Sequence, residues 1–167
     1  MSLPDIAELY AQYHGPLVRL LYRRTGDHDR AEDLAQEVFV RAMETPPLNA
    51  KPWLFAVALN LARDDGRRAA VRDRKLALLK AETDGAAPAA DAEALKGEKV
   101  AAVRAALEQL SRTDREALLL KTEGFSYEEI ASALGLAKGA IGTTLARARR
   151  RLVEAYGALE RTDHVAR

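Results

Sequence analysis

The sequence predicts an all-α fold of two small helical domains joined by a flexible linker, with a helix-turn-helix in the second domain. The 167 residues are 48% apolar and 31% charged but only 5% aromatic, a composition typical of helical proteins. Apolar residues recur at steps of three and four along both halves. Between the halves, the stretch from Thr83 to Asp91 is small and polar without periodicity, which indicates a linker.

These patterns also set the expected boundaries. A first domain is predicted over residues 1–75, a linker over 76–97, a second domain over 98–160 and a tail over 161–167. Domains typically contain about 50 to 200 residues, so each half is long enough for a thin core of its own.

Three helices are expected in the first half. The first bends or breaks at Gly15-Pro16 and ends at Gly26. The second covers residues 28–43 and stops before Pro46-Pro47. Because Pro52 suits a first helical turn, the third is expected over residues 52–74. The apolar stripe of the first helix consists of Ile6, Leu9, Tyr10, Tyr13, Leu17, Leu20 and Leu21.

The second half begins with a helix whose stripe contains Val100, Val103, Leu107 and Leu110. Two Ser/Thr-x-x-Glu segments follow, at residues 113–116 and 126–129, and each predicts a capping box at a helix start. Gly124 is placed to end the helix between them. A last helix is expected over residues 137–156, with Ile141, Leu145, Ala148 and Leu152 buried.

Residues 126–151 fit a helix-turn-helix. Small Ala131 allows a close crossing of the two helices, Gly135 supplies the turn, and Ile141 locks the second helix onto the first. Such a helix puts its first residues into the major groove, and later basic residues meet phosphates. An ordinary helical hairpin is the alternative.

Charge is distributed unevenly, although the net charge is only +1. Residues 1–50 contain eight acids and five bases, a net of −3, whereas residues 51–75 contain seven bases and three acids, a net of +4. Residues 137–151 contain five bases and no acid. This asymmetry favours two nucleic-acid contacts and a separate surface for another partner. Solvated helix faces are the alternative explanation for each basic run.

The third helix has a polar face that includes an aromatic residue. At about 100° per residue, Asn60, Asp64 and Arg67 fall within about 40° of Trp53, and the apolar residues lie opposite. An exposed aromatic beside Asn and Arg suits stacking on unpaired bases. Burial of Trp53 against a neighbouring helix end is the alternative.

Other function classes find little support. The three histidines are scattered, no Cys is present, and the acids show no ligand spacing, so neither a catalytic site nor a metal or cofactor site is expected. No apolar run approaches the roughly 20 residues of a membrane span, and the N-terminus does not resemble a signal peptide. We therefore expect a cytoplasmic protein without membrane insertion.

Several of these segments together resemble the small two-domain, extracytoplasmic-function (ECF) group of the sigma-70 family of RNA polymerase sigma factors. Residues 29–39 resemble the second conserved region, which binds the β′ clamp helices of the polymerase. Residues 52–55, 60–64 and 67–68 resemble the segment that melts and reads the minus-ten element. Residues 107–110, 115–116 and 124–152 resemble the domain that binds the minus-thirty-five element and the β flap.

The resemblance implies partners and site residues. It implies binding to core RNA polymerase and promoter DNA, and an anti-sigma factor as an inhibitor. The implied polymerase contacts are Asp33, Gln36 and Glu37. The implied minus-ten contacts are Trp53, Asn60, Arg63, Arg67 and Arg68, with Asn49 in a base-binding loop at residues 45–51. The implied minus-thirty-five contacts are Lys138, Thr143, Thr144, Arg147, Arg149 and Arg150.

The chain departs from the family pattern at three places. Leu110-Ser111 stands where Leu-Pro is usual, and Asp65-Gly66 replaces an apolar pair, which is expected to fray the third helix. Gly142 and Thr144 stand where the family has Lys and Arg, so weak minus-thirty-five recognition is expected. Two other functions therefore stay open: a stand-alone helix-turn-helix regulator and a sigma-like decoy that binds an anti-sigma factor.

Overall fold

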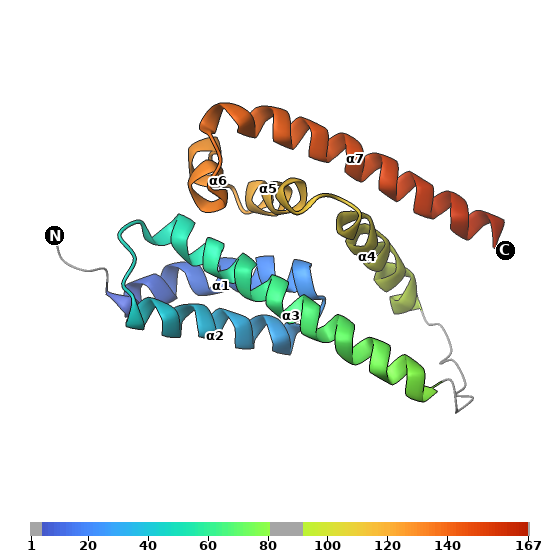
Figure 1. The fold of residues 1–167 in the computed structure, drawn as a ribbon, viewed down its shortest axis with the longest axis horizontal. Coiled ribbons are helices and arrows are strands. Elements are labelled where there is room, and N and C mark those ends of the chain that lie inside the picture. The colour runs from blue at the N-terminus through green and yellow to red at the C-terminus, as the bar shows by residue number, and fades with distance from the viewer. Residues whose placement is uncertain (1–4, 81–91, 167) are drawn as a thin grey trace.

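The computed structural model describes residues 5–80 and 92–166, and all regular structure in them is helical (Figure 1). The first half contains α1 (Ile6–Thr25), α2 (His28–Glu44) and α3 (Ala50–Lys80). The second half contains α4 (Ala92–Glu108), α5 (Arg112–Thr122), α6 (Tyr127–Leu134) and α7 (Lys138–Val165). The all-α prediction is confirmed.

Helices α1 and α2 form a tight hairpin. Gly26 ends α1 with a left-handed φ of 73°, and the Asp27 side chain caps α2 by accepting hydrogen bonds from the Asp29 and Arg30 amides. The first helix was predicted to bend or break at Gly15-Pro16, and a break is wrong, because α1 is continuous through these residues. The hydrogen bond that Pro16 cannot make is offset by packing, since the next turn buries Leu17 completely against α2 and α3.

Helix α3 is longer than predicted at both ends. It begins at Ala50, passes through Gly66 without a break and ends at Lys80, so the expected fraying does not occur. Residues 76–80 belong to α3 and residues 92–97 to α4, so the predicted linker is too long. The small polar stretch from Thr83 to Asp91 lies within residues 81–91, outside the described part.

The N-terminus of α5 is set by Ser111. Its Oγ accepts a hydrogen bond from the Asp114 amide at 3.3 Å, so the capping box predicted from Thr113 is wrong. The second predicted capping box is confirmed: Ser126 Oγ accepts from the Glu129 amide at 3.1 Å, and Glu129 Oε1 accepts from the Ser126 amide at 3.0 Å.

Helices α6 and α7 have the predicted helix-turn-helix connection. Gly135 ends α6 with a φ of 67°, a conformation that glycine adopts without strain. Ile141 and Leu145 of α7 are fully buried beside Ile130 of α6. Helix α7 continues past the predicted end to Val165, so residues 161–165 are helical and not a tail.

The two halves are packed together as two layers (Figure 1). Helix α3 lies against α6, and α1 touches α5. At the centre, the Phe55 and Phe125 rings meet edge to face with centroids 4.7 Å apart, and both are about 1% exposed. One hydrophobic core therefore runs through both halves.

Candidate polymerase and nucleic-acid interfaces

The outer face of α2 carries the three predicted polymerase contacts. Asp33, Gln36 and Glu37 are all exposed, because Ala35 and Val38 of the same turns point into the core. Glu37 pairs with Arg41 one turn later at 3.2 Å, and both side chains are about half exposed. The pair does not cover the face, which stays accessible, and Asp33 adds a negative charge to it.

Two apolar residues on the same face were missed by the sequence reasoning. Val40 is 41% exposed and Met43 is 60% exposed. At 100° per residue, Val40 lies about 200° from buried Val38, a position that the helical periodicity could have identified. Apolar side chains between acids give this face the mixed character of a protein–protein interface.

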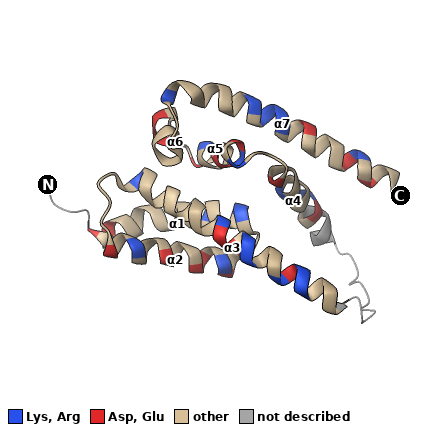
Figure 2. Ribbon diagram, in the orientation of Figure 1, with Lys and Arg blue, Asp and Glu red and all other residues tan. Residues whose placement is uncertain are grey.

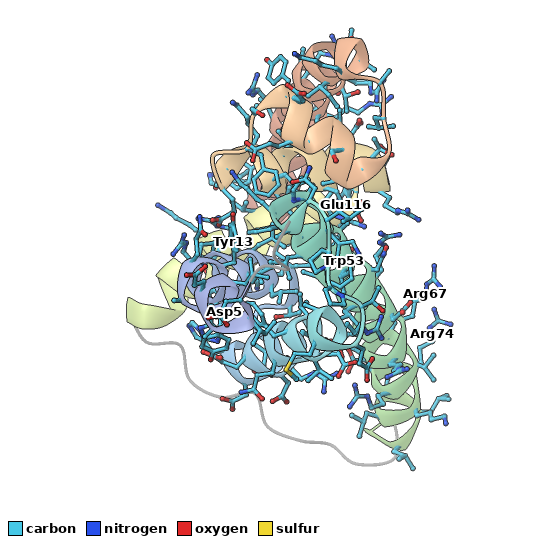
Figure 3. All side chains as sticks on the ribbon, turned by 90° about the vertical axis from the view of Figure 1, so that its left-hand side faces the viewer. Asp5, Tyr13, Trp53, Arg67, Arg74 and Glu116 are labelled. Carbon is cyan, nitrogen blue, oxygen red and sulfur yellow. The ribbon has the colours of Figure 1, made fainter. Side chains whose placement is uncertain are left out.

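The polar face of α3 carries the predicted minus-ten contacts. Asn60, Arg67 and Arg68 are exposed, and Arg67 and Arg74 project away from the bundle (Figure 3). Asn49 is exposed just before the helix, and its carbonyl accepts a hydrogen bond from the Trp53 amide at 3.3 Å. These side chains form one basic surface on α3.

Trp53 is neither fully exposed for base stacking nor fully buried against a neighbouring helix. Its side chain is half-buried and packs on the edge of the core. One part of the indole therefore anchors the start of α3 while another part stays accessible beside Asn49. A ring held in this way loses little freedom when it stacks on a base.

Arg63 forms an ion pair with a residue of the second half. Its Nε lies 2.9 Å from Glu116 Oε1 of α5, and it also contacts the Asn60 side chain. Burial raises the pKa of the Glu116 carboxyl above its ordinary range, against the opposing attraction of Arg63 and Arg112. Burial likewise lowers the pKa of Arg63. In this arrangement a protein carboxylate sits where Arg63 was expected to meet a phosphate.

The start of the recognition helix α7 exposes Lys138 and Thr143. Thr144, by contrast, is only 6% exposed, and its hydroxyl donates to the Ala140 carbonyl at 2.7 Å. The prediction that Thr144 reads base edges is therefore wrong, because its side chain belongs to the packed face of α7. A Cβ added at Gly142 would lie 3.6 Å from the Tyr127 ring, an ordinary contact.

Figure 2 shows a run of basic residues along α7. Its arginines divide into two kinds by their contacts. Arg147 donates hydrogen bonds from Nη2 and Nε to Oδ1 of fully buried Asp114, at 2.7 Å and 3.2 Å. Arg151 Nη1 donates to Asp114 Oδ2 at 3.1 Å. The hydrogen bond from Arg147 lowers the pKa of Asp114. Arg149 and Arg150 are exposed and have no acid within 4.0 Å among the described residues.

Acid–base pairs join the two halves, and we call the resulting packing the closed arrangement. Glu129 of α6 lies 2.7 Å from Lys51, which also sits over the Phe125 ring. Glu123, after α5, lies 2.5 Å from Arg23 and 3.4 Å from Arg19 of α1. Two further pairs between the halves are Arg63–Glu116 and Arg24–Glu108.

The described residues contain neither a membrane-spanning helix nor a metal-binding cluster. Within residues 5–80 and 92–166, no helix is long and apolar enough to cross a bilayer. No group of three His, Asp or Glu in that part of the chain is arranged to hold a metal ion.

Family comparisons match both halves. Sigma-70 region 2 matches residues 9–72, and sigma-70 region 4 matches residues 101–152. The ECF RNA polymerase sigma factor EcfG of Rhodopseudomonas palustris is 37% identical over 141 residues, which cover 77% of this chain and 72% of that protein. The ferric citrate uptake sigma factor FecI of Escherichia coli is 30% identical over 145 residues, 84% of each chain.

Solved structures agree with these matches. The sigma factor RpoE of Bartonella quintana, in complex with the anti-sigma factor NepR, is 26% identical with a TM-score of 0.56 over 90% of this chain and 96% of that one. The fold is also that of CnrH in complex with the cytosolic domain of CnrY, with a TM-score of 0.65 over 92% and 88% of the two chains at 24% identity. Two region matches in the expected order, together with relatives that align over most of the chain, show that this chain belongs to the ECF group of the sigma-70 family of RNA polymerase sigma factors.

Proposed function

We propose that this sigma factor binds core RNA polymerase through α2 and directs promoter recognition, melting and transcription initiation through α3 and α7. The observation that carries the proposal is the division of surfaces on one three-helix unit. The outer face of α2 is acidic and partly apolar, and the outer face of α3 is basic with an accessible aromatic edge. A regulator that acts alone on duplex DNA has no need for the first surface.

The polymerase surface consists of Asp33, Gln36 and Glu37, with Val40 and Met43 beside them. By family analogy, its target is the pair of β′ clamp helices, and the second half binds the β flap. Charged contacts at a rim tune association and selectivity, whereas the exposed apolar groups supply burial. We therefore expect the acids to orient the complex and Met43 to hold it.

The minus-ten surface uses stacking and phosphate contacts. Trp53 stacks on an unpaired base, Asn60 and Asn49 bond to base edges or sugar, and the arginines of α3 hold the backbone. Arg63 can join them only after Glu116 has left it. The two halves therefore separate before the promoter is melted.

The minus-thirty-five surface is weaker than in the family pattern. Lys138 and Thr143 are available for base edges, while Arg149 and Arg150 suit phosphates. Arg147 reaches DNA only at the cost of its bonds to Asp114. Sequence selection then rests mainly on the first half, and tethering through polymerase raises the local concentration of the second.

An inhibitory partner also fits this chain. The two solved relatives were captured as complexes, one with an anti-sigma factor and one with the cytosolic domain of CnrY. We propose that an anti-sigma factor also holds this chain inactive, with the closed arrangement as its target.

The test is run-off transcription with purified core polymerase over a promoter library. A template found in this way is then used to compare the wild type with Trp53→Ala and with Trp53→Tyr, which keeps an aromatic ring. Trp53→Ala should impair permanganate-detected melting more than closed-complex binding, and Trp53→Tyr should retain most of it. Unchanged melting at equal occupancy would remove Trp53 from the role. If no promoter in the library gives a transcript while the chain still binds core polymerase, the decoy function is favoured. That function stays open because the recognition helix has few basic residues in its first turns.

A further inference from the structure

A cleft of about 840 Å³ lies where the two halves meet. One wall comes from the end of α1, the start of α2 and the middle of α3, and the other comes from α4 and α5. Because the walls belong to different halves, the cleft exists only in the closed arrangement. Its volume falls within the roughly 300 to 1,000 Å³ typical of small-ligand sites.

The cleft is strongly basic. Eight arginines and four acids line it, for a formal net charge of +4. Glu116, which pairs with Arg63 and lies 3.8 Å from Arg112, offsets one further charge and leaves +3. The positive charge comes from both walls, because Arg63 and Arg67 of α3 line one wall and Arg104, Arg112 and Arg115 line the other.

Arg115 is a buried arginine in the wall of the cleft. The residue is 9% exposed, and its Nε is buried without a hydrogen-bond partner among the described residues. Its Nη1 lies 3.3 Å from Glu108 Oε2, and Glu108 also pairs with Arg24. Burial lowers the pKa of Arg115, and the positive charge of Arg24 lowers it further. An anion bound in the cleft would offset this repulsion.

We propose that the cleft binds a compact polyphosphate anion that bridges the two halves and holds the closed arrangement. Guanidinium groups match phosphate oxygens in pairs, and arginines on two walls can hold several phosphate groups at once. A DNA duplex is too wide to lie between walls that are already in contact. No aromatic side chain lines the cleft in the described part of the chain, so the phosphate groups, and not a nucleobase, are recognised.

The regulatory consequence rests on the proposed function. Arg63 and Arg67 line the cleft and are also the proposed minus-ten contacts, so a bound polyphosphate keeps both from promoter DNA. A ligand that binds only the closed arrangement shifts the chain toward it by mass action.

The experiment is isothermal titration of the full chain with inorganic tripolyphosphate at constant ionic strength. We expect one saturable site per chain. The double variant Arg104→Gln/Arg112→Gln removes two charges from the cleft and should weaken binding by about tenfold or more. Arg149→Gln/Arg150→Gln removes the same charge from the exposed face of α7 and should change affinity by less than about threefold. Arg112 is 60% exposed, so its replacement spares the core.

Equal weakening by the two double variants, or several equivalent sites per chain, would show general attraction of polyanions and overturn the proposal. Absence of binding at millimolar tripolyphosphate would overturn it too. The titration contains neither polymerase nor promoter, so its outcome is independent of run-off transcription. A chain that binds tripolyphosphate but starts no transcript would refute the proposed function alone.

Discussion

Asp114 holds the recognition helix to α5, and its replacement by Asn should destabilise the second half. The carboxylate is fully buried and accepts hydrogen bonds from three nitrogen atoms, two of Arg147 and one of Arg151. Asparagine keeps the shape but loses the charge and one acceptor oxygen. A hydrogen bond to a charged group contributes about 1.5 to 3 kcal/mol. Because both arginines are about half exposed and regain water, we expect a net loss of about 2 to 3 kcal/mol.

Urea unfolding of the full chain, followed by circular dichroism, measures this loss. With a slope of about 1 to 3 kcal/mol per molar urea, the midpoint should fall by about 0.7 to 3 M. Asp163→Asn makes the same chemical change at an exposed position near the end of α7 and should shift stability by less than about 0.5 kcal/mol.

The same prediction has a pH signature. The folded pKa of Asp114 is depressed, so its contribution is complete above the ordinary value of 3.8 and is lost as the pH falls through the folded value. The wild type and Asp114→Asn should therefore converge in acid and differ at pH 7. A difference below about 0.5 kcal/mol at pH 7 would refute the view that this carboxylate stabilises the helix-turn-helix.

Three further predictions concern the interfaces. Charge reversal at Asp33 and Glu37 should lower affinity for core polymerase without changing helicity; undiminished co-elution on a sizing column would contradict it. Gly142→Lys should tighten binding to promoter duplex and steepen its salt dependence, because it adds a cation and removes a helix-destabilising Gly; fluorescence anisotropy across a salt series measures both. The pKa of Glu116 is raised in the closed arrangement, so its protonation should favour that arrangement and compact the chain as the pH falls from 7 toward 4.5. The pKa of Glu129 is lowered there, so loss of its charge below pH 4.5 should loosen the chain again. A radius of gyration from X-ray scattering that is independent of pH would refute this.

Local patterns in the sequence were sufficient for most of the secondary structure. The capping box at Ser126, the left-handed turn at Gly135 and the buried face through Ile141 are each determined within a few residues. One error, at Pro16, lies where packing overrides local preference, and another, at Thr113, lies in the choice between two neighbouring hydroxyl residues as the helix cap. Helix α1 continues through Pro16, because the residues that follow it are buried. Helix α3 continues through exposed Gly66, whose cost of about 1 kcal/mol is too small to end a long helix.

The candidate sites were less predictable. Exposure of Asp33 and Asn60 followed from helical periodicity, but burial of Thr144 did not, because one polar residue on a helix edge can turn either way. No local sequence pattern predicts the ion pairs that join the two halves. Arg63 and Glu116 are 53 positions apart, and each looks like an ordinary charged residue on its own helix.

The edge-to-face contact of Phe55 and Phe125 makes the separation of the two halves depend on temperature. Both rings are almost completely buried in the closed arrangement, so separating the halves exposes aromatic surface to water and raises the heat capacity. Apolar burial contributes less at low temperature, whereas the desolvation cost of the surrounding ion pairs falls as temperature rises. Both effects point the same way: cooling should release the two halves from each other before either half unfolds, so that chilled cells would hold a larger share of the open form.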